Sequence, residues 1–136
     1  MDYTIITIDG NSMEPIYKSN MKVLLKQNVN NYNVGDVVVY YQNNKMIIHR
    51  IIQIVDNKLA ITKGDNNLYA DKTVRVSKII GKVIDNLDRS DKQSIAIYSK
   101  LVAIVVEKYG NSHRITQMFF HIFTKYLEVK FKQINL

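Results

Sequence analysis

The sequence predicts a mainly β fold, in which a folded antiparallel β-sheet core is followed by a C-terminal α-helical hairpin. Short runs rich in Val, Ile and Tyr recur through residues 3–88, with polar turn clusters between them. After residue 85 the hydrophobic period changes from two residues to about 3.6. Apolar residues make up 46% of the 136 positions, which is enough for one packed core.

Six runs are typical of strands, because each is rich in β-branched or aromatic residues and ends at a polar turn. Close spacing and polar turns favour antiparallel pairing of sequence neighbours, as in a barrel-like or folded sheet. The predicted strands are residues 3–8, 21–26, 36–41, 46–55, 59–62 and 79–84.

The last third of the chain favours two helices that form an αα-hairpin. Gly110 is a suitable stop for the first helix, and Ser112 begins the next element. The first helix is expected to bury the face formed by Tyr98, Leu101, Val102 and Val105. The second carries an apolar stripe made of Ile115, Met118, Phe119, Ile122, Phe123, Tyr126 and Leu127.

The net charge of +7 is concentrated in the C-terminal segment. Residues 89–136 contain eight Lys or Arg and three Asp or Glu, which leaves +5 for that segment. The chain has no cysteine, so disulfides, a thiol nucleophile and thiolate metal sites are excluded. Residues 1–8 are too short and polar for a signal peptide, and the near-apolar run 95–106 is too short to span a bilayer. We therefore expect a cytoplasmic protein or one peripheral on a membrane.

Ser12 lies in a segment with an unusual backbone, directly after the first predicted strand. Pro15 is the only proline of the chain, and its fixed φ restrains Glu14 and stiffens the backbone behind the serine. Two interpretations remain open at this point. Ser12 is either a turn residue that bonds its own backbone or a nucleophile held in a rigid loop.

His49 interrupts a strongly apolar predicted strand, and two aspartates follow it in or near a turn. Such a histidine is usually a sheet residue with a satisfied hydrogen bond, but a serine nucleophile needs an imidazole to take its proton. Asp65 or Asp71 then offers a carboxylate that can accept the second imidazole N–H. Asp65 is equally suited to closing its own turn.

These segments occur together and in one order, and as a set they resemble type I signal peptidases. The resemblance spans roughly residues 8–84 and is greatest to the archaeal and endoplasmic-reticulum branch, which uses a Ser–His pair. The matching segments are Ser12-Met13-Glu14-Pro15, residues 34–40, Ile48-His49-Arg50-Ile51, Thr62-Lys63-Gly64-Asp65-Asn66-Asn67 and Ile80-Gly81-Lys82-Val83.

The resemblance implies a serine endopeptidase on a signal peptidase/LexA-like core, with Ser12 as nucleophile and His49 as general base. It places Asp71 behind the histidine and makes Asp65 a further candidate for a supporting role. The Ser12 N–H is expected in the oxyanion hole. No metal and no cofactor are implied. The expected substrate is a precursor or leader peptide bound in an extended conformation.

We accordingly divide the chain into a β-rich serine peptidase catalytic core, 1–88, and a basic helical appendage, 89–136. The appendage has no counterpart in the resemblance. Its stripe of Phe and Lys either packs onto the core or the partner helix, which we favour, or makes peripheral contact with a membrane. One alternative is a non-catalytic peptide- or membrane-binding module on the same fold. Another is a LexA-like self-cleaving regulator, a class that uses a lysine base. Lys45 and Lys63 flank the His49 strand and the turn, so they are the lysines to test as an alternative base. Nucleic-acid binding is not expected, because no known module for it is present.

Overall fold

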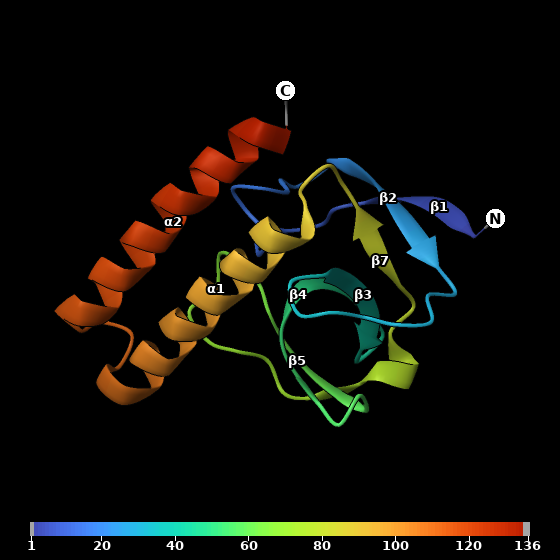
Figure 1. The fold of residues 1–136 in the computed structure, drawn as a ribbon. Helices are drawn as coiled ribbons and strands as arrows, with labels where there is room; N and C mark the ends of the chain where they lie inside the picture. Colours follow the sequence, from blue (N-terminus) through green and yellow to red (C-terminus); the bar gives the residue numbers. More distant parts are fainter. Residues whose placement is uncertain (1, 135–136) are drawn as a thin grey trace.

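The computed structural model describes residues 2–134, which form a bent β-sheet with a helical hairpin along one side (Figure 1). The strands are β1 Tyr3–Thr7, β2 Lys22–Gln27, β3 Val37–Gln42, β4 Lys45–Val55, β5 Leu59–Lys63, β6 Val74–Arg75 and β7 Gly81–Ile84. A 3-10 helix, η1 Val76–Lys78, separates β6 from β7, and the helices are α1 Arg89–Tyr109 and α2 Arg114–Ile134.

The six predicted strands and the helical hairpin are confirmed, with most strand boundaries within one residue. The last predicted strand is shorter than expected, because η1 ends at Lys78 and only residues 81–84 join the sheet. The sequence analysis missed β6, a two-residue strand that pairs only with Leu59 and Ala60. A strand this short has no alternating pattern to detect.

All strand pairs in the sheet are antiparallel, in the order β1-β2-β7-β3-β4-β5-β6. Most strands pair with a neighbour in sequence, but β7, the last strand of the chain, lies between β2 and β3 and does not pair with β6. The pairing of β4 with β5 shifts register between Ile51 and Gln53. Such an irregularity bends the strand locally. This irregularity lies two to four residues after His49 in the chain.

The helical hairpin shares its hydrophobic core with the sheet. Helix α1 lies between the sheet and α2 (Figure 1). One buried cluster combines Val39 of β3 and Val83 of β7 with Ile95 of α1 and Leu127 of α2. The division at residue 88 therefore coincides with the start of α1, while the packed interior continues across it.

The predicted buried face of α1 is largely wrong. Tyr98 and Leu101 are 46% and 41% exposed, and only Val102 of the expected set is fully buried. The buried face instead includes three small residues, Ala96, Ser99 and Ala103, and small side chains let the helix backbone approach the sheet closely. The buried residues of α1 are Ile95, Ala96, Ser99, Val102, Ala103 and Val106.

The contact at Gly35 shows how closely α1 approaches the core. A Cβ added to Gly35 would lie 2.6 Å from the carbonyl carbon of Lys92, in the first turn of α1. The helix begins nearby at Asp88, whose side chain accepts a hydrogen bond from Asp91 N–H. Lys130 of α2 reaches back to the Asp91 carboxylate at 2.6 Å. Both helices are thus fastened near the point where the chain leaves β7.

Candidate active site

The fold brings together Ser12, His49 and Asp71 from three separate segments. Ser12 lies in the loop between β1 and β2, His49 on β4, and Asp71 in the loop between β5 and β6. His49 Nε2 is 3.1 Å from Ser12 Oγ, and His49 Nδ1 is 2.6 Å from Asp71 Oδ2. The side chains of His49 and Asp71 are 10% and 22% exposed, so the group is partly shielded and still reachable.

The carboxylate determines which nitrogen of His49 carries the proton. An ionised carboxylate only accepts hydrogen bonds, so Nδ1 must donate to Asp71. In the neutral imidazole, Nε2 then presents its lone pair to Ser12 Oγ. An imidazole in this arrangement can take the proton of the hydroxyl group, and the carboxylate can stabilise the resulting cation.

A chain of hydroxyl groups holds Asp71 from behind. Thr62 Oγ1 donates to Asp71 Oδ2 at 2.8 Å, and Tyr40 OH lies 2.8 Å from the same threonine oxygen. Because the threonine proton is already used, Tyr40 must be the donor. Burial chiefly raises the pKa of Tyr40 to about 12, so its phenol keeps that proton. The Asp71 backbone N–H also donates to Thr62 O at 2.8 Å.

The turn at residues 64–67 holds the loop that carries Ser12. The Asn66 N–H donates to Ser12 O at 2.8 Å, and the Asp65 N–H donates to Met13 Sδ at 3.4 Å. A Cβ on Gly64 would lie 2.7 Å from Ser12 O. Only glycine permits this close approach without moving the loop.

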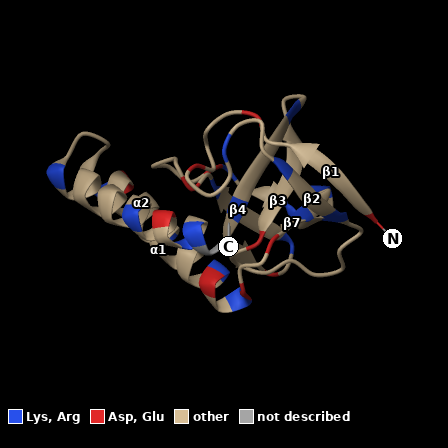
Figure 2. Ribbon diagram, turned by 90° about the horizontal axis from the view of Figure 1, so that it is seen from above, with Lys and Arg blue, Asp and Glu red and all other residues tan. Residues whose placement is uncertain are grey.

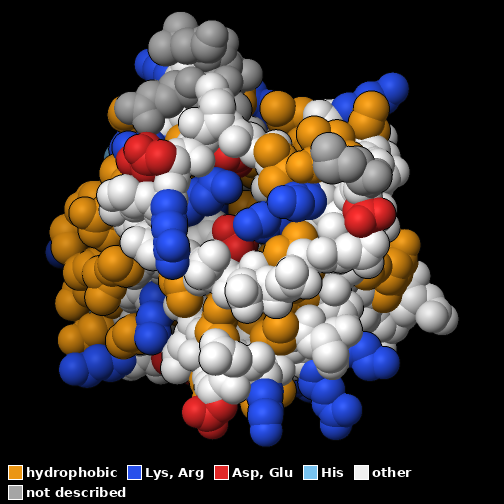
Figure 3. Space-filling model, turned by 45° about the vertical axis from the view of Figure 1, so that its right-hand side comes forward, with side chains coloured by type: hydrophobic (Ala, Val, Ile, Leu, Met, Phe, Trp, Pro, Cys, Tyr) orange, Lys and Arg blue, Asp and Glu red, His pale blue; other side chains and the backbone are white. Residues whose placement is uncertain are grey.

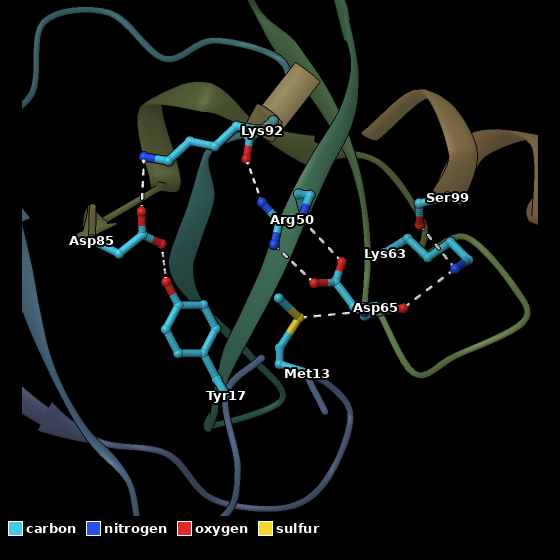
Figure 4. Close-up of polar contacts among 10 residues, drawn as sticks. Met13, Tyr17, Arg50, Lys63, Asp65, Asp85, Lys92 and Ser99 are labelled. Carbon is cyan, nitrogen blue, oxygen red and sulfur yellow. Dashed lines mark hydrogen bonds and ion pairs between the residues drawn. The ribbon is translucent and has the colours of Figure 1, made fainter. Parts of the chain in front are cut away.

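A second anchor fixes the chain just beyond Ser12 and Met13. The buried Tyr17 hydroxyl donates to Asp85, and Asp85 lies 3.7 Å from the Lys92 ammonium (Figure 4). Burial first, and then the charge of Asp85, raise the pKa of Tyr17 well above its ordinary value. Tyr17 therefore stays protonated and ties the Ser12 loop to the segment between β7 and α1.

Asp65 binds Arg50 instead of His49. The guanidinium donates from Nε and Nη2 to the two carboxylate oxygens at 3.0 and 2.9 Å, and from Nη1 to Gly35 O at 2.9 Å (Figure 4). Both side chains are fully buried. Burial lowers the pKa of Arg50, but the charge and hydrogen bonds of Asp65 outweigh it and raise the pKa. The pair is a rigid ionic link under the turn.

A hollow of about 420 Å³ opens beside the serine. Its apolar wall includes Ile8, Met13 and Ile48, and Asp9 and Lys45 are the charged residues that line it. Lys45 therefore borders the same hollow as Ser12. Lys63 does not border it, because its ammonium contacts Ser99 of α1 at 2.9 Å.

Ser12, His49, Asp65 and Asp71 were predicted as site residues from the sequence, whereas Tyr40, Arg50 and Thr62 were given no role. Arg50 and Thr62 lie within the segments that resemble signal peptidases, which is the signal that could have drawn attention to them. Tyr40 is the last residue of another such segment, 34–40, but nothing in the sequence indicates its partner. Its contact with Thr62 depends on how β3, β4 and β5 are paired.

Within residues 2–134, no three His, Cys, Asp or Glu side chains cluster in a way that would hold a metal ion. The helices of the same range include none with the length and apolar character needed to cross a bilayer.

Comparison with known proteins gives a family and a set of related enzymes. Residues 1–84 match the family model described as Peptidase S24-like, which ends at the last residue of β7. The chain is 37% identical over 95 residues to the signal peptidase complex catalytic subunit SEC11 of Saccharomyces cerevisiae strain YJM789, and equally to that of strain RM11-1a. Each alignment covers 58% of this chain and 56% of SEC11, so the chain spans about half the length of these curated relatives. No solved structure gives a significant match.

Proposed function

The chain belongs to the Peptidase S24-like family, and from this membership we propose that it is a serine endopeptidase of the signal-peptidase type. In this proposal Ser12 is the nucleophile, His49 the general base and Asp71 the acid that orients His49. The observation that supports it most directly is the position of His49, with one ring nitrogen on Ser12 Oγ and the other on Asp71. The similarity to SEC11, a signal peptidase catalytic subunit, agrees with this chemistry.

The proposed reaction proceeds through an acyl-enzyme. Ser12 Oγ bonds to the carbonyl carbon of the scissile peptide while its proton passes to His49 Nε2, and the Ser12 N–H donates to the developing oxyanion. The C–N bond then breaks as His49 returns the proton to the leaving amine. A water molecule next loses its proton to His49 and attacks the ester carbonyl. The ester C–O bond then breaks as His49 returns this proton to Ser12 Oγ, which releases the new carboxyl terminus.

We propose that an extended substrate lies along the free edge of the first half of β4. Residues 45–50 pair with β3 on one side, whereas β5 begins to pair only at Arg50. No strand of residues 2–134 covers the other edge of residues 45–48, which borders the hollow beside Ser12. A peptide added there as a strand would present its carbonyl to the serine. Family resemblance implies small side chains just before the cut, and the apolar wall of the hollow suits them.

The direct test is cleavage of synthetic precursor peptides that carry small residues before the expected cut. Mass spectrometry of the products is compared between the wild-type protein and Ser12→Ala prepared in parallel. We expect one new pair of termini that only the wild type produces. Equal cleavage by both proteins, or no cleavage of any peptide with a small residue at that position, would overturn the proposal. Peptide that binds without being cut would favour the non-catalytic module.

We further propose that the outer face of the hairpin contacts an anionic membrane surface. Ile97, Leu101 and Ile104 are exposed on successive turns of α1, and Met118 and Ile122 are exposed on α2. Figure 3 shows hydrophobic side chains gathered on the side of the molecule where the hairpin lies. Lys and Arg recur along the same helices (Figure 2). An apolar stripe with basic neighbours is typical of a surface that lies on anionic lipid.

Co-sedimentation with vesicles tests this contact. The protein should sediment with phosphatidylcholine–phosphatidylserine vesicles at low salt, and less at high salt or with phosphatidylcholine alone. The double variant Leu101→Glu/Ile122→Glu should stay in the supernatant. Ile5→Glu is the matched control, because Ile5 is exposed on β1, away from the hairpin. Equal sedimentation of the double variant and the control would contradict the assignment of this face.

A further inference from the structure

Lys63 is a fully buried lysine that links the sheet to both helices of the hairpin. It is the last residue of β5, and its side chain is inaccessible to solvent. Its ammonium donates to Ser99 Oγ of α1 at 2.9 Å and lies 5.3 Å from the centre of the Phe123 ring of α2. It also lies 3.4 Å from Gly64 O in the next residue (Figure 4). One side chain thus contacts α1, α2 and the turn that follows β5.

The backbone on both sides of Lys63 holds the proposed catalytic group. On one side, the Thr62 carbonyl oxygen accepts a hydrogen bond from the Asp71 N–H, and the Thr62 hydroxyl donates one to the Asp71 carboxylate. Gly64, on the other side, begins the turn whose Asn66 N–H donates to Ser12 O. A displacement of Lys63 would therefore move the supports of the nucleophile and of the acid together.

The charges around Lys63 do not fully offset the cost of burying its ammonium group. Burial lowers its pKa, the nearby Asp65 and Asp71 raise it, and Arg50 lowers it, with a net value of about 8. From the helices, the ammonium of Lys63 contacts the Ser99 hydroxyl and the Phe123 ring, neither of which carries a charge. An ion pair of full strength would have kept the pKa near or above its ordinary value. An apolar side chain of similar length should fit this site without loss of stability.

We propose that Lys63 is a positioning residue through which the C-terminal hairpin fixes the geometry of Ser12 and Asp71. Ser99 holds the ammonium from α1, Phe123 covers it from α2, and the ammonium in turn fixes the start of the 64–67 turn. The inference rests on the proposed peptidase function, because it assigns the hairpin a role in that reaction. A separate Ser99–Lys63 catalytic pair is excluded, since both side chains are fully buried and no substrate reaches them.

The test compares three variants with one matched control. Lys63→Met keeps the length of the side chain and removes its charge and donors, and Ser99→Ala removes the partner hydroxyl. The third variant combines both changes. Lys58→Met makes the same substitution at an exposed lysine in the β4–β5 turn. Each protein is assayed for kcat and KM on one peptide, for thermal midpoint, and for amide hydrogen exchange at Asn66 and Asp71.

We expect Lys63→Met to lower kcat by about ten- to a hundredfold with KM within about threefold, since small misplacements of reacting groups reduce the rate of the chemical step. The double variant should be little worse than Lys63→Met, because the two residues act as one pair. Exchange at Asn66 and Asp71 should be faster than in the Lys58→Met control. The thermal midpoint should be unchanged or higher, whereas a purely structural role would lower it.

Two results would overturn the inference. One is a kcat for Lys63→Met equal to that of the control. The other is slow, wild-type exchange at Asn66 and Asp71 in Lys63→Met. The exchange measurement tests the positioning role of Lys63 even if the protein cleaves no peptide. Failure of the peptidase proposal can therefore be distinguished from failure of the positioning role. If Lys63→Met has lower activity and a lower thermal midpoint, but amide exchange at Asn66 and Asp71 stays at the wild-type rate, then Lys63 only stabilises the fold.

Discussion

His49 and Arg50 are neighbours on β4, yet they bind two different aspartates on opposite faces of the strand. Successive side chains of a strand alternate between its faces. His49 therefore contacts Asp71 at 2.6 Å on the partly exposed side, while Arg50 holds Asp65 in the fully buried interior. The two acids are six residues apart in sequence and sit in different electrostatic environments, which predicts different consequences when each is neutralised.

Asp65→Asn should destabilise the fold. It leaves the buried Arg50 guanidinium without its counter-charge, and breaking a buried ion pair in this way lowers the free energy of unfolding by about 3–5 kcal/mol. Urea unfolding measures the change. Asp56→Asn, at an exposed turn position, should stay within about 0.5 kcal/mol of the wild type. A midpoint for Asp65→Asn equal to that of Asp56→Asn would show that the Arg50 contact contributes nothing.

Asp71→Asn should instead lower activity. The amide keeps the shape of the carboxylate and can still accept from Thr62, but it carries no charge to stabilise the imidazolium. A loss in kcat of up to roughly ten-thousandfold is expected, smaller than the loss on removal of Ser12 or His49. Steady-state assays and urea unfolding are run on the same preparation. If Asp71→Asn lost stability as Asp65→Asn does and kept its kcat, the roles of the two acids would be reversed.

Much of the fold, and three of the residues that meet at the candidate site, could be predicted from the sequence. Alternation of Val, Ile and Tyr defines the longer strands, and the Ser12, His49 and Asp71 segments were recognised as a set. The pairing of Asp65 with Arg50 could not be predicted, because it depends on which face of β4 each side chain takes. The buried face of α1 was missed because Ala96, Ser99 and Ala103 pack there, and small residues contribute little to a hydrophobic pattern.

The lowered pKa of Lys63 predicts that the free energy of unfolding rises between about pH 8 and pH 10.5. Burial lowers the pKa of Lys63 from 10.5 to about 8, so in this interval the unfolded chain binds a proton that the folded chain has released. Stability rises with pH wherever the unfolded state binds more protons. This fall in pKa corresponds to on the order of 3 kcal/mol in the free energy of unfolding. The folded protein gains the whole amount only above pH 10.5.

Urea unfolding of the wild type and Lys63→Met at pH 7.5 and pH 10.5 isolates this contribution. Tyrosines and other lysines titrate in both proteins, so the difference between the two proteins reports Lys63 alone. The variant should be the more stable protein at pH 7.5, and its advantage should shrink at pH 10.5. An advantage that is the same at both pH values would mean that Lys63 keeps its ordinary pKa.

Removal of residues 88–136 should destabilise the β-rich core without removing any proposed catalytic residue. Ile95 and Val102 of α1 and Leu127 of α2 share one buried cluster with the sheet, so truncation exposes apolar surface to water. We expect a lower unfolding midpoint or self-association, measured by circular dichroism and size-exclusion chromatography. A truncated chain that stays monomeric with the full-length midpoint would show that the hairpin is an independent appendage.

The last prediction concerns Ser12 and His49 as one unit. Ser12→Ala and His49→Ala should each remove nearly all cleavage, and the double variant should be little worse. Groups that share one proton transfer lose their effect together, and a complete serine–histidine–acid group is worth on the order of a millionfold in rate. Initial rates on one good peptide measure all of these effects.

Lysine variants provide the decisive control, because related peptidases with a lysine base share this core. Lys45 borders the same hollow as Ser12, so it is the lysine with access to the nucleophile. Lys45→Met should keep most of the activity if His49 is the base. Lys63→Met should lower the rate without abolishing it, since its ammonium contacts Ser99 and not Ser12. Substantial cleavage by His49→Ala together with an inactive Lys45→Met would replace the Ser–His assignment with a Ser–Lys mechanism.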